Sequence, residues 1–122
     1  MARILVAEDD ADVLQLIALT LELDGHQVVN AASGDEVLRH AMQARPDVIV
    51  LDVMMPRVDG LTTLRQLRQQ PLTRDIPVVL LSAKAQHDDI EAGMQAGATC
   101  YVTKPFEPDY LAAEVERVVA TS

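Results

Sequence analysis

The sequence predicts a doubly wound α/β domain, in which a five-stranded parallel sheet is covered by five helices. The chain has 122 residues, enough for one domain with its own core. Short aliphatic runs recur roughly every 20 to 30 residues, about the length of a strand and a crossover helix. The segments between these runs carry apolar residues at helical spacing. Strands that are apolar on both faces need helices on both sides of the sheet.

The elements alternate regularly along the chain. The predicted strands are the aliphatic runs at residues 4–7, 28–29, 48–51, 78–81 and 101–102. The predicted helices contain the apolar repeats at residues 13–21, 37–41, 61–67, 90–94 and 111–118. Residues that break regular structure stand at the boundaries, namely Gly25, Gly34, Pro46, Gly60, Pro77, Gly97 and Pro105. Asp35 and Asp109 add negative charge where their helices begin, which the helix dipole favours.

The composition argues against several classes of function. The net charge is −9, which repels phosphate backbones and disfavours nucleic acids and anionic membranes as direct partners. Aromatic residues make up only 2% of the chain, so no platform for stacking bases is expected. Cys100 is the only cysteine, which excludes an intrachain disulfide and a cysteine metal cage. The sequence carries neither a signal peptide nor a membrane span, and we expect a cytoplasmic protein.

Polar side chains follow the predicted strands at the edge of the sheet where ligands bind in this architecture. Glu8 and Asp9 follow the first strand, Asp52 ends the third, Ser82 ends the fourth and Lys104 follows the fifth. Crowded carboxylates repel one another unless a cation or a proton neutralises them. Mg²⁺ takes oxygen ligands and keeps several waters, so one or two carboxylates and a backbone carbonyl suffice. The sequence therefore predicts a magnesium site, with Lys104 opposite the acids to pair with Asp52 or with a phosphoryl group.

These residues resemble the receiver domain of two-component response regulators. The motifs that carry the resemblance occur in order at matching strand ends: Glu8-Asp9, the run from Asp52 to Pro56, Asp59-Gly60, Ser82-Ala83 and Lys104-Pro105-Phe106. The resemblance covers the whole chain, so residues 1–122 are predicted to form one receiver domain. It implies a flavodoxin-like fold with strand order 2-1-3-4-5.

The resemblance implies a phosphorylation-dependent signalling switch. Asp52 would accept a phosphoryl group from a sensor histidine kinase or a histidine phosphotransfer protein. Asp9, Asp52 and the Met54 backbone carbonyl would bind Mg²⁺, with Glu8 acting through water, and Lys104 would neutralise charge on the phosphoryl group. The domain would signal to a downstream output protein or domain. It would promote only its own phosphorylation and dephosphorylation, so it is not expected to be an enzyme.

The resemblance also implies how the phosphorylated state is read out. The Ser82 hydroxyl would donate a hydrogen bond to a phosphoryl oxygen and draw the following loop inward, and Tyr101 would move into the vacated space. The Lys104–Pro105 peptide bond is expected to be cis, as in the family.

Several alternatives stay open at this point. Ser82 could instead be the N-cap of the helix that follows it. Leu14, Leu19 and Leu23 widen the apolar stripe of the first helix; we favour cover by neighbouring helices, and the alternative is a docking face for the kinase. An aspartate-based phosphohydrolase is the less favoured function, because it would need a second acid where Met54 stands. A nucleotide-binding domain of this architecture is excluded, because it would need a glycine-rich loop where the first acids would repel phosphates.

Oligomeric state and chain length complete the expectations. Some receivers dimerise through an acidic pair that is replaced here by Thr99 and Cys100, so we expect a monomer before phosphorylation. Cys100 is expected to be a buried small residue. Three histidines are expected to be exposed structural residues rather than metal ligands: His26, His40 and His87. The chain is either a stand-alone receiver ending at Ser122 or the N-terminal part of a regulator with a DNA-binding or enzymatic output domain.

Overall fold

The computed structural model describes residues 1–55 and 59–121, and its strands and helices alternate as predicted. The strands are β1 (Arg3–Ala7), β2 (Gln27–Ala31), β3 (Val48–Asp52), β4 (Val78–Ser82) and β5 (Cys100–Thr103). The helices are α1 (Ala11–Leu23), α2 (Gly34–Ala44), α3 (Gly60–Gln69), α4 (His87–Gln95) and α5 (Pro108–Thr121). Pro56 of the family motif and Ser122 lie outside the described residues.

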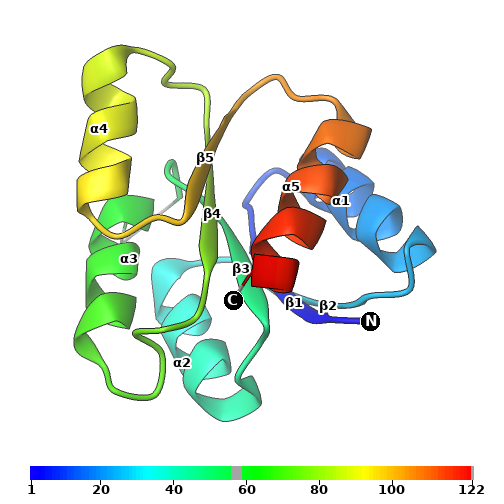
Figure 1. Cartoon of the computed structure of the whole chain (residues 1–122), viewed down its shortest axis with the longest axis horizontal. Helices are drawn as coiled ribbons and strands as arrows, with labels where there is room; N and C mark the ends of the chain where they lie inside the picture. Colours follow the sequence, from blue (N-terminus) through cyan, green and yellow to red (C-terminus); the bar gives the residue numbers. More distant parts are fainter. Residues whose placement is uncertain (56–58, 122) are drawn as a thin grey trace.

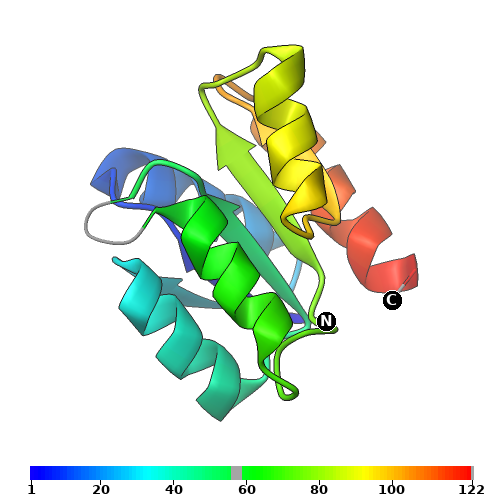
Figure 2. The ribbon, with the colours of Figure 1, turned by 90° about the vertical axis from the view of Figure 1, so that its left-hand side faces the viewer.

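All five strands are parallel and lie in the order β2-β1-β3-β4-β5. Helices α1 and α5 cover one face of this sheet, and α2, α3 and α4 cover the other (Figure 1). Figure 2 shows the second layer from the front, with the three helices side by side. The predicted doubly wound fold is therefore confirmed, and the order of strands reverses between β1 and β3, where such folds bind ligands.

Each face of the sheet has its own aliphatic core. On the α1 and α5 side, Ile4 and Val6 of β1 pack in one cluster with Ile17 of α1. On the other side, Leu5 of β1 packs in a second cluster with Leu64 of α3. Neighbouring residues of one strand point to opposite faces, so a strand covered on both faces is apolar at nearly every position.

The strands are longer than their aliphatic runs because the backbone ladder continues into polar residues. Asp52 and Ser82 are the last residues of β3 and β4, and both are buried. The helices begin at polar caps: Asp10 caps α1 and Asp59 caps α3, each accepting hydrogen bonds from backbone N–H groups of the first turn. The polar residues at these ends are thus positioned by regular structure on both sides.

A largely buried arginine ties together the turns at the amino ends of β4 and β5. The guanidinium of Arg68, in the last turn of α3, donates twice to the Gly97 carbonyl, at 3.0 and 2.8 Å. It also donates to the carbonyls of Arg74 at 3.0 Å and Ile76 at 2.7 Å. Gly97 has a φ of +112° and a Cβ there would lie 2.9 Å from Arg68 Cγ, so both its backbone and its neighbour require glycine.

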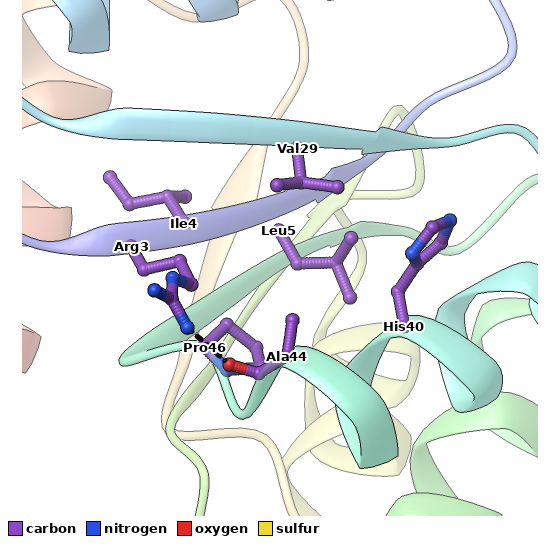
Figure 3. Close-up of a pocket in the computed structure, with 7 residues that line it drawn as sticks. All are labelled: Arg3, Ile4, Leu5, Val29, His40, Ala44 and Pro46. Atoms are coloured by element: carbon purple, nitrogen blue, oxygen red, sulfur yellow. Dashed lines mark hydrogen bonds between the residues drawn. The ribbon is translucent and has the colours of Figure 1, made fainter.

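Figure 3 shows a small recess near the amino end of β1. It is lined by Arg3, Ile4, Leu5, Val29, His40, Ala44 and Pro46. The Arg3 guanidinium donates to the Ala44 carbonyl at 2.7 Å, which joins the start of β1 to the end of α2. This contact is structural and lies away from the polar ends of the strands.

The expectation that the histidines are exposed is wrong for His26. This side chain is 8% exposed, and its Nδ1 accepts a hydrogen bond from the Ala2 N–H at 2.9 Å. Its Nε2 lies 2.7 Å from a carboxylate oxygen of Glu116. Both partners are distant in sequence, so no local pattern could reveal them. His40 is partly buried, His87 is exposed as expected, and the prediction of a buried Cys100 is confirmed.

Candidate functional site

The polar ends of β1, β3, β4 and β5 meet at one edge of the sheet. Ala7 of β1 is in register with Leu51 of β3, so Glu8 and Asp52, the next residues, lie next to each other. Ser82 of β4 is in register with Thr103 of β5, which brings Lys104 to the same edge. Parallel register alone therefore gathers residues that are far apart in the chain.

Lys104 bridges the two buried carboxylates. Its Nζ donates to Glu8 Oε1 at 2.8 Å and to Asp52 Oδ2 at 2.9 Å. The other oxygen of Asp52, Oδ1, accepts the backbone N–H of Met54 at 3.0 Å. The side chains of Glu8 and Asp52 are 0% and 3% exposed, whereas that of Lys104 is 22% exposed. The ion pairs are therefore largely removed from water, and charges interact more strongly in the protein interior than in water.

One cation does not satisfy both acids. Burial raises the pKa of Glu8 to about 8, and the hydrogen-bonded neighbour Asp52 adds to this effect. Burial alone would lower the pKa of the Lys104 ammonium, but its hydrogen bonds to Glu8 and Asp52 outweigh burial and raise it above its usual value. Lys104 therefore stays charged at neutral pH, and Glu8 keeps a proton to a higher pH than an ordinary glutamate does.

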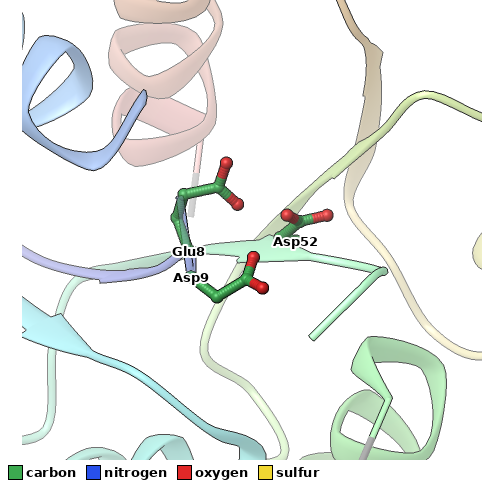
Figure 4. A group of neighbouring side chains, drawn as sticks. All are labelled: Glu8, Asp9 and Asp52. Atoms are coloured by element: carbon green, nitrogen blue, oxygen red, sulfur yellow. The ribbon is translucent and has the colours of Figure 1, made fainter. Parts of the chain in front are cut away.

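The residues present fit a hard divalent cation. Carboxylate oxygens of Glu8, Asp9 and Asp52 lie within 4.8 Å of one another, and Figure 4 shows these three side chains gathered at the end of the strands. Glu8 Oε2 is buried and has no hydrogen-bond partner among the described residues, so an acceptor is left for a ligand or its water. Asp9 is exposed, which gives solvent access to the cluster. The Met54 carbonyl stays a predicted ligand.

The backbone of Lys84 links Ser82 with Tyr101. Ser82 Oγ accepts the Lys84 N–H at 3.0 Å, and the Tyr101 hydroxyl donates to the Lys84 carbonyl at 2.8 Å. The Tyr101 hydroxyl is thus bound to the loop that follows Ser82, and its movement on phosphorylation stays a prediction. The alternative role of Ser82 as a helix cap is wrong, because α4 begins later and its N-cap is Gln86.

Three contacts of the site could not be predicted from sequence patterns. Lys84 takes part through its backbone N–H and carbonyl, which every residue except proline has. Gly60 makes the close approach of α3 to β3 possible, since a Cβ there would collide with the Asp52 carbonyl oxygen and lie 2.7 Å from Val53 Cα. Gly93 lies against Tyr101. The Lys104–Pro105 peptide bond is cis, the isomer expected from the sequence.

The fold and the site together define a class of protein: a doubly wound α/β domain with a cluster of carboxylates and a lysine at the reversal of strand order. The family model of the response regulator receiver domain matches residues 4–116. The chain belongs to this family, as the sequence motifs predicted.

Curated relatives and solved structures agree with this assignment. The chain is 40% identical over 120 residues to the alkaline phosphatase synthesis transcriptional regulatory protein PhoP of Bacillus subtilis, covering 98% of this chain and 49% of the relative. It is 38% identical to the phosphate regulon transcriptional regulatory protein PhoB of Escherichia coli, covering 96% of this chain and 51% of the relative. The chain therefore spans about half the length of these relatives.

Two solved receiver structures match nearly the whole chain. The Francisella response regulator 1452 receiver domain has a TM-score of 0.94 and 35% identity, covering 99% of this chain and 98% of that one. The Vibrio cholerae chemotaxis protein CheY4 has a TM-score of 0.91 and 34% identity, covering 97% and 98%. Among the described residues, none of the helices is long and apolar enough to cross a membrane.

Proposed function

We propose that this chain is a phosphorylation-dependent switch in which Asp52 accepts a phosphoryl group from a phosphohistidine. The observation that carries the proposal is the position of Asp52, a buried carboxylate held by Lys104 beside two further acids. In the transfer, an Asp52 carboxylate oxygen forms a bond to phosphorus while the phosphorus–nitrogen bond of the donor breaks. The released imidazole takes a proton from solvent, and Asp52 becomes an acyl phosphate.

The neighbouring residues would position and neutralise the phosphoryl group. Phosphoryl transfer has a loose transition state with its charge on the equatorial oxygens, so little covalent work falls to the protein. The Lys104 ammonium would move from Asp52 Oδ2 to a phosphoryl oxygen. Mg²⁺, when bound by Asp9, Asp52 and the Met54 carbonyl with Glu8 through water, supplies further positive charge. Ser82 now accepts a hydrogen bond, so its own proton is available for a phosphoryl oxygen.

We further propose that the donor docks on α1, next to the acceptor. Leu16, Leu19 and Leu23 are 45%, 53% and 85% exposed. The favoured expectation, that neighbouring helices cover the extra leucines of α1, is thus wrong for Leu19 and Leu23, whereas the partly buried Leu14 packs against the core. A nearly apolar recess of about 360 Å³ beside Lys104 continues this face. It is lined by Val13, Leu16, Ala83, Lys104, Pro105 and Phe106. An apolar helix of a kinase or histidine phosphotransfer protein fits such a surface.

The proposal also covers the bounds of the domain and the output domain or protein that it controls. We assign residues 1–122 to one receiver domain that signals to an output domain or partner protein. The relatives are named transcriptional regulators and are about twice as long, which favours an output domain in the whole protein. A cytoplasmic location, a monomeric state before phosphorylation and the lack of direct nucleic-acid contact stay predictions.

The test is phosphoryl incorporation from two kinds of donor. With acetyl phosphate and Mg²⁺, the chain is expected to gain one acid-stable, base-labile phosphoryl group by intact mass, and Asp52→Asn is expected to gain none. With a phosphorylated histidine kinase, Leu19→Asp is expected to slow transfer while leaving the acetyl phosphate reaction unchanged. Leu72→Asp, at an equally exposed leucine outside α1, is the matched control. Incorporation in Asp52→Asn would contradict the acceptor assignment.

A further inference from the structure

Gly93 of α4 lies directly against the ring of Tyr101. It is buried, and a Cβ at this position would lie 2.9 Å from Tyr101 Cδ2 and Cε2 and from Leu80 Cδ1. Real Cβ atoms essentially never make contacts this short. The tyrosine ring therefore fills the space that a side chain at position 93 would need.

The backbone of α4 does not itself require glycine here. Gly93 lies within the helix rather than at its end, and its φ is not in the left-handed region. Glycine inside a helix is unfavourable compared with alanine, because it loses more conformational freedom on folding. The observation that accounts for glycine at this position is the contact with the ring and with Leu80.

The ring in turn holds the loop between β4 and α4. The Tyr101 hydroxyl donates to the Lys84 carbonyl at 2.8 Å, and the Lys84 N–H donates to Ser82 Oγ at 3.0 Å. Contacts thus run without interruption from Gly93 through Tyr101 and Lys84 to Ser82, which ends the strand next to Asp52. A displacement of the ring would break the hydrogen bond between the Tyr101 hydroxyl and the Lys84 carbonyl.

We propose that Gly93 is a positioning residue for Tyr101. The missing side chain at position 93 lets the ring lie where its hydroxyl binds the loop, and any side chain there drives the ring outward and releases the loop. This inference deepens the proposed function and rests on it for its meaning in signalling, because the released loop carries the Ser82 contact. The position of the ring itself can be measured without phosphorylation.

The first test is the solvent exposure of Tyr101. The chain has two tyrosines and no tryptophan, so Tyr110→Phe leaves Tyr101 as the only strong intrinsic fluorophore. In this background, Gly93→Ala is expected to increase acrylamide quenching of Tyr101 toward that of an exposed tyrosine. It is also expected to slow phosphoryl incorporation from acetyl phosphate at saturating Mg²⁺. Glu91→Ala, at an exposed position of the same helix, is the matched control and should change neither quantity.

The second test asks whether the ring is the obstacle. With Tyr101 present, Gly93→Ala is expected to lower the melting temperature. In a Tyr101→Ala background it is expected to raise the melting temperature, because Leu80 can relax into the vacated space and alanine favours the helix. Unchanged quenching in Gly93→Ala, or a lowered melting temperature in both backgrounds, would overturn the proposal. If the parent chain accepts no phosphoryl group, the proposed function is wrong. The quenching result still decides whether Gly93 positions the Tyr101 ring, because it does not depend on phosphorylation.

Discussion

The two ends of the sheet each hold a largely buried cation, and they hold it differently. At the carboxyl ends of the strands, the Lys104 ammonium lies between the carboxylates of Glu8 and Asp52. At the amino ends of β4 and β5, the Arg68 guanidinium is surrounded by backbone carbonyls of Gly97, Arg74 and Ile76. One cluster pairs the cation with two buried carboxylates, whereas in the other all the hydrogen bonds go to neutral carbonyls and the Asp75 carboxylate acts only as a nearby charge.

The difference separates a site that exchanges partners from one that cannot. Under the proposed function, Lys104 would leave Asp52 for an incoming anion and a metal ion would take its place; Glu8 Oε2 is still without a partner among the described residues. Arg68 has no such substitute, since its departure would leave the partly buried carbonyls of Gly97 and Ile76 without this donor. The proposed function thus gives the charge at one end a role in signalling, whereas the charge at the other end holds turns together.

The largest effect that would test this comparison is expected at the structural end. Arg68→Leu should lower the free energy of unfolding by about 3 kcal/mol, because several carbonyls lose a charged donor. Urea unfolding measures this loss, and phosphoryl incorporation in the remaining folded protein should be intact. Arg65→Leu, at an exposed position of the same helix, should change stability by less than about 0.5 kcal/mol. Equal losses in the two variants would contradict the structural role of Arg68.

A second, smaller effect is expected at the functional end and depends on pH. The pKa of Glu8 is about 8 in the folded chain against an ordinary value of 4.5, so the folded state binds this proton more tightly than the unfolded state does. The stabilisation is therefore fully present below pH 4.5 and is lost as the pH rises toward 8. Without metal, Glu8→Gln should remove this loss and be more stable than the parent by about 2 kcal/mol at pH 6, about 1.5 pH units above the ordinary value of 4.5.

Magnesium supplies the control for the pH effect. At about ten times its dissociation constant, Mg²⁺ should restore about 1.4 kcal/mol to the parent at pH 7.5. Because Glu8 would act on the metal only through water, Glu8→Gln should respond less. Asp9→Asn, at the exposed acid of the cluster, should leave the slope of stability against pH in place. Thermal unfolding between pH 5 and 8, with and without Mg²⁺, measures these terms, and a flat profile in the metal-free parent would contradict them.

The smallest effect is expected at a buried position that involves no cation. Like Glu8 Oε2, Thr63 Oγ1 of α3 is a buried side-chain oxygen without a hydrogen-bond partner among the described residues. Thr63→Val keeps the shape and removes the unpaired hydroxyl, so it should raise stability by about 1 kcal/mol. Thr73→Val is the matched control: its hydroxyl donates to the Leu67 carbonyl at 2.6 Å, so stability should fall. A loss in both variants would indicate an unrecognised partner of Thr63.

The sequence predicted the fold well because the signal is local. Aliphatic runs of four residues mark β1, β3 and β4, and the strands exceed them by a single residue each. The short run at 28–29 underestimated β2, an edge strand in which only these two valines are half-exposed and which also includes Gln27, Asn30 and Ala31. Backbone pairing needs only N–H and C=O groups, so polar residues join a strand without changing the hydrophobic pattern.

The residues of the candidate site were predicted, but its energetics were not. Glu8, Asp9, Asp52 and Lys104 could be placed at one edge from topology alone. The sequence could not predict that Glu8 is almost fully buried with one oxygen unpaired, since burial depends on packing around the whole edge. The contacts of His26, and the contact of Arg68 with Gly97, depend on residues far away in the chain, which hydrophobic periodicity does not reveal.

The link between Ser82 and Tyr101 uses the main chain of residue 84, and Lys84 is itself an exposed residue. A survey that replaces side chains one at a time would pass over this position, and only proline, which lacks the N–H, would disclose it. The side chain at position 84 is consequently not constrained by these two hydrogen bonds. Two domains of this design can carry different side chains there for partner recognition and still keep the same main-chain link between Ser82 and Tyr101.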